Sequence, residues 1–429
     1  MVADAGVWLS CFCSGSPMHI RLRRHGGRML VWCDQTRMAD RHPNPSLASP
    51  RSASIPPICK GHCPDGSIAT AQQIKPMSSS YSEDERILLL EGFLQDLTQI
   101  FADQPQESSV EDVLELILAQ LRTVVCLARS KHDMDILCSE ILAFKMFDDE
   151  PLAVLRYLEQ HLEENGSSEE ALILYSLLYH LGHIWPNAYR KLSEEGYLIK
   201  LADAVQTRDY ILIHVCVSLM LEICRIEELS ISDLGQFSTR FLDALFDEIE
   251  ETGYDHLEEC NHAMIKLLLA VNGQFLRINA AREVVPNPIL SLLKARLERC
   301  QLFSQNVIFV FNRSDEAGLQ IDCIGFMAQI FSCKELGSFF YTNDIKVIVD
   351  ILLREIVDFP EESDLIRLEY MKVLAMILRC DIYGSDLNRY KCRDIHRTLV
   401  GIKNDPLSKT EVNRLAEKIL GDCADALVF

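Results

Sequence analysis

Apolar residues recur at spacings of three and four along nearly the whole chain from Asp84 onward. This spacing places them on one side of a helix with 3.6 residues per turn. The first such series is Ile87, Leu88, Leu90, Leu94, Leu97 and Phe101. The same pattern predicts helices at about 111–129, 133–147, 150–164, 169–184, 208–226, 233–251, 255–278, 287–299, 304–312, 316–333, 343–357, 362–380, 391–402 and 408–426, with two shorter ones at 187–195 and from 197. Alternating Val, Ile and Thr strands with Asn-Gly turns are almost absent, so we expect an all-α fold.

Many of these predicted helices are apolar over most of their circumference, as in residues 171–185 and 265–276. Helices of this kind need neighbours on both sides. A series of about fifteen helices with short connectors fits an α-solenoid of the armadillo or HEAT type. Because no repeat signature recurs at a fixed period, we expect degenerate helical repeats.

Residues 1–79 differ from the rest of the chain. They contain the Pro-Ser-Arg cluster HPNPSLASPRSASIPP at 42–57 and no sustained hydrophobic period. This composition predicts disorder, followed by a helical domain at 80–429. The residues from Met77 onward suit a chain start, so an extension of the gene model is one interpretation of the upstream segment. A mitochondrial presequence is less favoured, because no amphipathic helix forms around its arginines.

Charge is unevenly distributed along the chain. Residues 1–76 hold nine of the 42 Lys and Arg residues and four of the 63 Asp and Glu residues. The remainder therefore carries 33 basic against 59 acidic side chains, a net charge of −26. A body of this charge repels phosphate backbones, which argues against nucleic-acid binding and favours a partner with a basic surface.

Cysteine usage and hydropathy indicate the compartment. The chain has 16 cysteines, and most of those that follow residue 77 lie inside apolar runs, where free thiols behave as small hydrophobic groups. Cys126, Cys216 and Cys224 are examples. This pattern suits a reducing compartment and predicts a cytoplasmic protein. No run reaches the roughly 18 apolar residues that span a membrane, so we expect no membrane insertion.

The sequence lacks the motifs of common catalytic sites. It contains no phosphate-binding G-x-x-x-x-G-K-[ST] loop, no G-x-S-x-G elbow and no H-E-x-x-H helix, which predicts a protein that is not an enzyme and binds no cofactor. Two groups were weighed as metal ligands, and coincidence is favoured for both because their spacings are unlike known zinc sites. They are Cys59, His62 and Cys63, and His256, Cys260 and His262.

An acidic stretch covers residues 243–259. We interpret it as a solvated helix face, with a docking face for a basic partner as the alternative. Its members are Asp243, Asp247, Glu248, Glu250, Glu251, Asp255, Glu258 and Glu259. Polar breaks at 312–316 and 341–344 separate strongly apolar helices. Their Asn, Ser, Thr and Asp residues favour helix capping, and direct contact with a ligand is the second interpretation.

The two polar breaks lie in segments that resemble a known family. Residues 306–316 (NVIFVFNRSDE), 339–378 (beginning FFYTNDIKVIVDILLRE) and 389–399 (RYKCRDIHRTL) are similar to the leucine-rich domain of the WISH/DIP/SPIN family. That family includes the animal SH3-containing NCK-interacting protein and shorter fungal relatives. Residues 171–198 fit it as well, and the resemblance covers roughly 85–402.

The resemblance implies an armadillo-like domain that binds and activates the Arp 2/3 complex without a preformed filament. The nascent actin filament would be an indirect partner, and the linear product would seed branched networks at cortical, endocytic actin patches. No SH3-like domain or long proline-rich tail is recognised, which suggests the compact fungal form. A general α-solenoid adaptor in trafficking is the alternative. The candidate protein-binding residues are Asn312, Arg313, Tyr341, Asn343, Asp344, Lys346 and Arg354.

Overall fold

The computed structural model of the chain divides into two units, Met1–Gln72 and Gln73–Phe429. In the first unit it describes the backbone of three strands. In the second it describes residues 81–427 with short gaps at 104–107, 165–166, 227, 254–256, 281–284, 315, 359–363 and 407–409.

The first unit contains a three-stranded antiparallel sheet in the order β1-β2-β3. The strands are β1 (Trp8–Cys13), β2 (Ser16–His25) and β3 (Arg28–Asp34). Arg21 at the middle of β2 lies opposite Trp8 on one side and Trp32 on the other. The hydrophobic pattern does not predict this sheet. Most of the segment predicted to be disordered, 1–79, lies outside the described residues, and the boundary at residue 80 stays a prediction.

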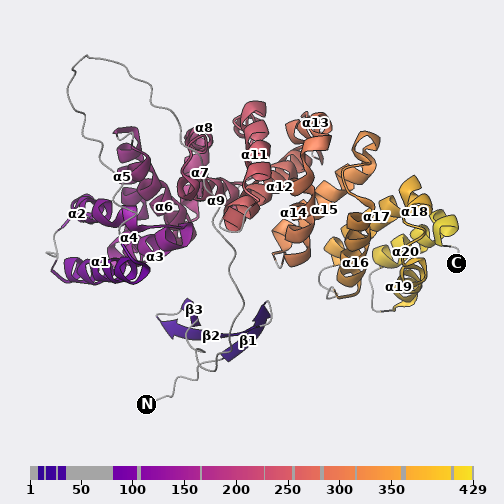
Figure 1. The fold of residues 1–429 in the computed structure, drawn as a ribbon, viewed down its shortest axis with the longest axis horizontal. Coiled ribbons are helices and arrows are strands. Elements are labelled where there is room, and N and C mark those ends of the chain that lie inside the picture. The colour runs from indigo at the N-terminus through magenta and orange to yellow at the C-terminus, as the bar shows by residue number, and fades with distance from the viewer. Residues whose placement is uncertain are drawn as a thin grey trace, which may run out of the picture. The chain divides into compact units, whose positions relative to one another are not determined.

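The second unit consists of helices, and the predicted all-α, solenoid-like fold is confirmed for it (Figure 1). The α-helices are α1 (Glu83–Asp103), α2 (Val110–Val124), α3 (Lys131–Leu142), α4 (Lys145–Asp149), α5 (Pro151–Glu164), α6 (Ser168–Ile184), α7 (Asn187–Glu194), α8 (Tyr197–Ala204), α9 (Tyr210–Ile226), α10 (Ile231–Leu234), α11 (Thr239–Glu251), α12 (Glu258–Ala280), α13 (Pro288–Ala295), α14 (Gln301–Arg313), α15 (Ala317–Ser332), α16 (Thr342–Asp358), α17 (Asp364–Arg379), α18 (Asp381–Ser385), α19 (Cys392–Asn404) and α20 (Thr410–Asp422). Short 3₁₀ turns follow several of them, at Val125–Leu127, Leu297–Arg299, Lys334–Leu336 and Ala424–Leu427.

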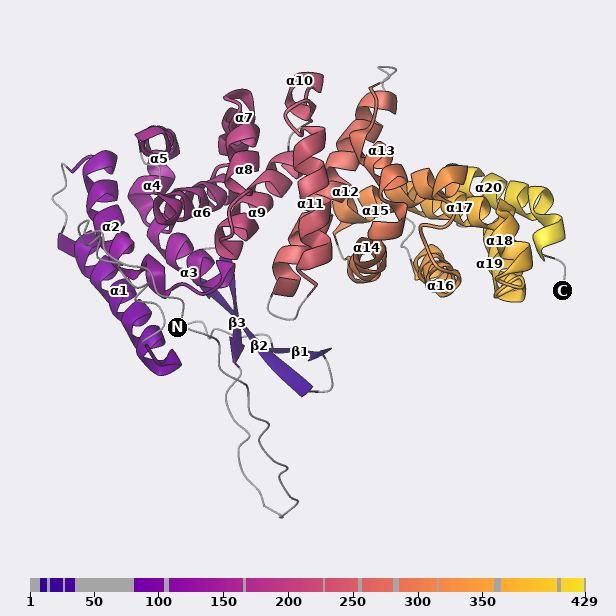
Figure 2. The same cartoon turned by 45° about the horizontal axis from the view of Figure 1, so that its top comes forward.

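The helices of this unit stack in rows (Figure 2). A central row consists of α3, α6, α9, α12, α15, α17 and α20, each packed against the next. A flanking row consists of α11, α14, α16 and α19, which pack against one another and, one by one, against the central row. The buried side chains of both rows belong to one continuous apolar core. Stacked helix pairs of this kind are what the all-round apolar helices require.

Two predicted helices are divided in the structure. The predicted helix 133–147 consists of α3 and α4, and the chain bends at Ala143 and Phe144, where the Phe144 ring stacks on Phe101 at 3.7 Å between centroids. The predicted helix 233–251 consists of α10 and α11, because Ser238 caps a new helix by accepting the Phe241 N–H at 3.2 Å. Local capping and tertiary packing therefore overrode an apolar period that runs through both breaks.

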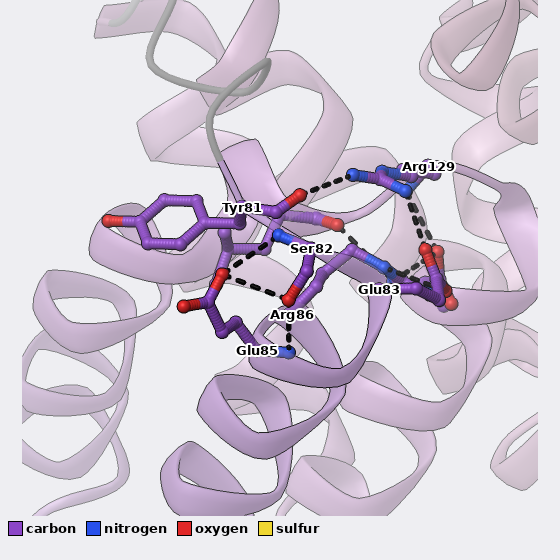
Figure 3. A network of polar contacts seen from close by, with 8 residues as sticks. Tyr81, Ser82, Glu83, Glu85, Arg86 and Arg129 are labelled. Carbon is purple, nitrogen blue, oxygen red and sulfur yellow. Dashed lines mark hydrogen bonds and ion pairs between the residues drawn. The ribbon is translucent and has the colours of Figure 1, made fainter.

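A polar network surrounds the start of α1, the first helix of the solenoid (Figure 3). The Ser82 hydroxyl accepts the N–H of Glu85 at 3.3 Å, and the Glu85 carboxylate accepts the N–H of Ser82 at 2.9 Å, which is a capping box. Arg86 is only 7% exposed and donates to Glu83, to Asp133 on α3 at 3.1 Å, and to a backbone carbonyl. This network connects the start of α1 to α3.

Candidate protein-binding surface

The structure brings two of the predicted contact residues together across neighbouring helices. Asn312 lies at the end of α14, and Arg354 lies in the last half of α16. The Arg354 guanidinium donates to the Asn312 side-chain oxygen at 2.9 Å and to its backbone carbonyl at 3.4 Å. Glu355 accepts from the same guanidinium at 2.7 Å. Arg354 is therefore held in one orientation although its side chain is 46% exposed.

The other predicted residues of α16 gather in its first turn. The Asp344 carboxylate accepts the N–H of Tyr341 at 3.2 Å, so it satisfies a free amide at the start of the helix. The Lys346 ammonium donates to the Asn343 side chain at 3.4 Å. Asp344 thus fits the capping interpretation, whereas Tyr341 is 52% exposed and remains open to a partner.

The connection between α18 and α19 adds residues that the sequence analysis did not single out. The Tyr390 hydroxyl donates to Asp350 of α16 at 3.2 Å, and the Lys391 ammonium pairs with the same carboxylate at 2.7 Å. This hydrogen bond raises the pKa of Lys391. Lys346 lies 5.9 Å from the centroid of the Tyr390 ring, within the range of a cation–π contact. The segment 389–399 contributed to the family resemblance, but no spacing within it indicated a contact with α16.

This connection adopts a backbone conformation that side chains disfavour. Asn388, Arg389 and Lys391 have φ angles of 46°, 53° and 52°, in the left-handed region. Such conformations cost on the order of 1 kcal/mol each and persist only where surrounding contacts impose them. Here the contacts of Tyr390 and Lys391 with Asp350 supply that constraint. The strained connection therefore holds the start of α19 against α16.

Together these side chains form a mixed basic and apolar surface, which we call the α14–α16–α19 surface. Val347 and Val357 of α16 are 46% and 62% exposed between the charged groups. Exposed apolar groups surrounded by polar ones are typical of protein interfaces. The residues that define the surface are Asn312, Tyr341, Asn343, Asp344, Lys346, Val347, Asp350, Arg354, Val357, Tyr390 and Lys391. Arg313, the remaining predicted residue, lies instead over the ring of Phe309.

The acidic stretch has structural partners that the sequence did not indicate. Asp243 and Asp247 both pair with Arg296, which is only 5% exposed. The Glu250 carboxylate accepts the N–H groups of Leu302 and Phe303 at 3.0 and 2.8 Å. Glu250 of α11 thus caps α14 from outside that helix. Asp243 and Asp247 keep side chains that are 47% and 60% exposed, so they lie on a solvated helix face while they pair with Arg296. Glu250 instead serves the neighbouring helix as a cap.

The structure also bears on the metal and membrane questions. Cys59, His62, Cys63 and His256 lie outside the described residues. Cys260 is buried, and the ring of His262 stacks on Phe309. Within the described part of the chain, no group of three or more His, Cys, Asp or Glu side chains is arranged to hold a metal ion. Over the same residues, no helix combines the length and apolar character needed to cross a membrane.

Comparison with known proteins places the surface in a recognised domain. Residues 257–395 match the family model of the SPIN90/Ldb17 leucine-rich domain. Protein dip1 of Schizosaccharomyces pombe is 24% identical over 296 residues, which cover 61% of this chain and 79% of that protein. The predicted family relationship is confirmed. Every residue of the α14–α16–α19 surface lies within the matched segment.

Two longer relatives match over a shorter stretch. Protein LDB17 of Saccharomyces cerevisiae is 30% identical over 122 residues, 28% of this chain and 24% of that protein. Protein LDB17 of Eremothecium gossypii is 28% identical over 121 residues, 28% of this chain and 26% of that protein. The chain therefore matches about a quarter of each LDB17 protein.

Proposed function

Because residues 257–395 match the family model of the SPIN90/Ldb17 leucine-rich domain, we propose that this chain binds the Arp 2/3 complex and activates it to nucleate actin. The nucleation would need no preformed filament and would produce linear filaments that seed branched networks at cortical, endocytic actin patches. The family match is the observation that carries this proposal. The chain would act by binding alone, without catalysis and without a cofactor.

Activation by binding requires a difference in affinity between two states of the partner. A ligand shifts a conformational equilibrium only by the difference between its binding free energies for the two states. Roughly 3 kcal/mol of difference would raise the ratio of active to inactive complex more than a hundredfold. A helical stack with one continuous core suits this role, because it resists the deformation that would let it fit both states equally well.

We assign the contact to the α14–α16–α19 surface. Arg354 is positioned by Asn312 and Glu355, and Lys391 is positioned by Asp350. Side chains that are already ordered lose less conformational entropy when a partner binds. Tyr341, Val347 and Val357 supply exposed apolar area between these charges. Aromatic and arginine side chains commonly dominate the binding free energy of such interfaces.

A pyrene-actin assembly assay with purified Arp 2/3 complex tests the proposal. We expect the purified chain to shorten the lag of assembly without added filaments. A protein that binds the complex but never accelerates assembly at saturation would contradict activation. A protein that does neither would support the alternative of a general adaptor in trafficking.

Charge reversal separates the surface from the fold. We expect Lys346→Glu combined with Arg354→Glu to weaken binding of the complex at least tenfold while the melting temperature stays within a few degrees. Lys372→Glu on α17 is the matched control, because Lys372 is as exposed as Arg354 and lies outside the surface. Unchanged binding by the double variant would place the contact on another face.

A further inference from the structure

A furrow runs between α12 and α14, next to the α14–α16–α19 surface. It consists of two adjoining hollows of about 270 and 310 Å³ that share His262 and Phe309 as their common floor. Glu258, Asn261 and Asn306 line one end of the furrow. Lys266 and Arg313 line the other end. Each hollow is large enough for one or two side chains and too small for a bulky cofactor.

The floor of the furrow is held in place by stacking and by amide hydrogen bonds. The rings of His262 and Phe309 are nearly parallel with centroids 4.7 Å apart. Asn306 donates to Asn261 at 2.9 Å, and buried Asn261 donates to the Ile249 carbonyl at 2.7 Å. These bonds join α11, α12 and α14 beneath the furrow. The shape of the floor is therefore formed before any ligand arrives.

The charges at the wider end are unbalanced. The Arg313 guanidinium carbon lies 4.5 Å from the centroid of the Phe309 ring, and Lys266 comes from the facing helix. Within the described residues, neither side chain forms an ion pair or a hydrogen bond with a carboxylate. Glu316 also lines this end, but its carboxylate pairs with Arg225 at 2.8 Å. An arginine of α12 is matched, because Arg277 pairs with Asp322 of α15.

His262 contributes an aromatic surface without adding charge. Burial of the ring lowers the pKa of His262, which favours its neutral form. The floor is thus apolar and aromatic, with two cations at one end and the Glu258 carboxylate, 4.0 Å from the His262 ring nitrogen, at the other end. This arrangement stands out in a chain whose residues 77–429 carry 33 basic against 59 acidic side chains.

We propose that the furrow binds an acidic segment of a partner protein, with a carboxylate on Lys266 and Arg313 and an apolar side chain on the His262–Phe309 floor. A carboxylate forms two parallel hydrogen bonds with a guanidinium, and stacking on Phe309 fixes the plane of Arg313 for that contact. The identity of the partner as the Arp 2/3 complex rests on the proposed function. The binding chemistry of the furrow does not.

Charge and size favour this occupant over two others. A nucleic acid brings a continuous row of phosphates, which the acidic surroundings of the furrow repel. A second copy of this chain brings another body of strongly negative charge, and two such bodies repel each other at a distance. A short acidic segment has a carboxylate for the two cations and carries far fewer negative charges than a nucleic acid or a second copy of this chain.

Fluorescence polarisation with a labelled peptide tests the binding chemistry. The probe is Glu-Glu-Leu-Phe-Glu-Glu, and the comparison peptide replaces every Glu by Gln. We expect the purified chain to bind the acidic peptide at least tenfold more tightly than the Gln peptide, with affinity falling as salt is added. Lys266→Glu combined with Arg313→Glu should lower that affinity at least tenfold, and Phe309→Ala should lower it severalfold.

A matched control keeps this test specific. Lys200 of α8 also lies over an aromatic ring, Tyr197, but it pairs with Glu163 at 3.3 Å. Lys200→Glu should leave peptide binding unchanged. Circular dichroism melting of each variant confirms that it is folded. Equal binding of both peptides, or undiminished binding by the folded Lys266→Glu, Arg313→Glu variant, would overturn the proposal.

Binding of the purified Arp 2/3 complex by the same variants tests the partner. We expect the Lys266→Glu, Arg313→Glu variant to bind the complex at least tenfold more weakly than the wild-type chain. If this variant loses the peptide but binds the complex normally, the furrow is not the contact and the proposed function stands. If the wild-type chain binds the peptide but not the complex, the proposed function fails and the furrow stands.

Discussion

The start of α1 and the furrow between α12 and α14 use arginine in opposite ways. At the start of α1, Arg86 is 7% exposed and is surrounded by Glu83, Asp133 and a backbone carbonyl (Figure 3). In the furrow, Arg313 is exposed, rests on Phe309 and has no carboxylate partner within the described residues. A buried guanidinium needs partners to offset its lost hydration, whereas an exposed one on a ring does not. The first therefore stabilises the fold, and the second remains able to bind a partner.

The largest expected effect comes from breaking the network at α1. Arg86→Met would leave Asp133, a largely buried carboxylate, without its guanidinium partner. We expect a loss of about 2 to 4 kcal/mol in the stability of α1 against local unfolding. Hydrogen exchange of the α1 amides measures this directly. Arg129→Met is the control, since Arg129 is half exposed and should cost less than about 1 kcal/mol. Equal protection in Arg86→Met and the wild type would show that the network is not structural.

A second ion pair that joins two helices lies in the central row. A methyl group added to Gly273 of α12 would lie 2.0 Å from a carboxylate oxygen of Asp322 on α15, which pairs with Arg277. We expect Gly273→Ala to lower the free energy of unfolding by about 1 to 3 kcal/mol, because Asp322 must move away from Arg277. Denaturant unfolding measures the loss.

The double variant tests the cause of that loss. Combining Gly273→Ala with Asp322→Ala removes the clashing carboxylate. The second substitution should then cost less in the Gly273→Ala background than in the wild type, since the two effects share one contact. Strictly additive losses would contradict the proposed clash.

The next smaller effect concerns His214, a largely buried side chain. No group of opposite charge lies close enough to offset the cost of its burial. Burial lowers the pKa of His214 on α9 from 6.5 to about 4, with Lys131, Asp135 and Lys266 as the charged groups nearby. The unfolded chain therefore binds a proton at a higher pH than the folded chain does. Stability is complete above pH 6.5 and falls as the pH drops toward 4.

Replacing this histidine removes its share of the acid sensitivity. We expect His214→Leu to reduce the stability lost between pH 6.5 and 4 by about 1 to 2 kcal/mol. Denaturant midpoints across that range measure the difference, with His396 on the surface of α19 replaced as the control. Parallel pH profiles of the wild type and His214→Leu would contradict the assignment.

The smallest effect on stability is expected at Arg313, in the furrow between α12 and α14. Arg313→Met removes the guanidinium that lies over the Phe309 ring, a charge that pairs with no carboxylate within the described residues. The free energy of unfolding should change by less than about 0.5 kcal/mol. Thermal and denaturant unfolding measure this. A loss above 1 kcal/mol would show that Arg313 has a structural role like that of Arg86.

Much of the secondary structure could be predicted because the relevant signals are local. The apolar spacing of residues 171–184 and the hydroxyl of Ser167, which caps α6 in the structure, lie within one or two turns of each other in the chain. The bend at Ala143 and Phe144 could not be predicted in this way, because it accompanies stacking of Phe144 on Phe101, more than forty residues away. Glu250 as the cap of α14 has the same origin in a distant contact.

The residues of the candidate surface also divide into those that the sequence indicated and those that only a tertiary contact defines. Asn312, Tyr341 and Arg354 were indicated by polar breaks and by the family resemblance, and Asn312 and Arg354 prove to be in contact. Tyr390 and Lys391 were not indicated, because their contact with Asp350 depends on a connection with three left-handed residues, Lys391 among them. Non-glycine residues seldom adopt that conformation, and no residue type announces it.

By itself, the sequence determined that the chain from Asp84 onward forms packed helices, since their apolar period and caps are local properties. It also indicated the similarity to the SPIN90/Ldb17 leucine-rich domain. Only the tertiary structure decided which charges are matched. Arg86, Arg296 and Arg354 find partners 42 to 53 residues away on neighbouring helices, whereas Lys266 and Arg313 face each other across a furrow and find no carboxylate partner within the described residues. The reason is that stacking sets the neighbours of each helix face, and Coulomb interactions depend on those distances and not on sequence separation.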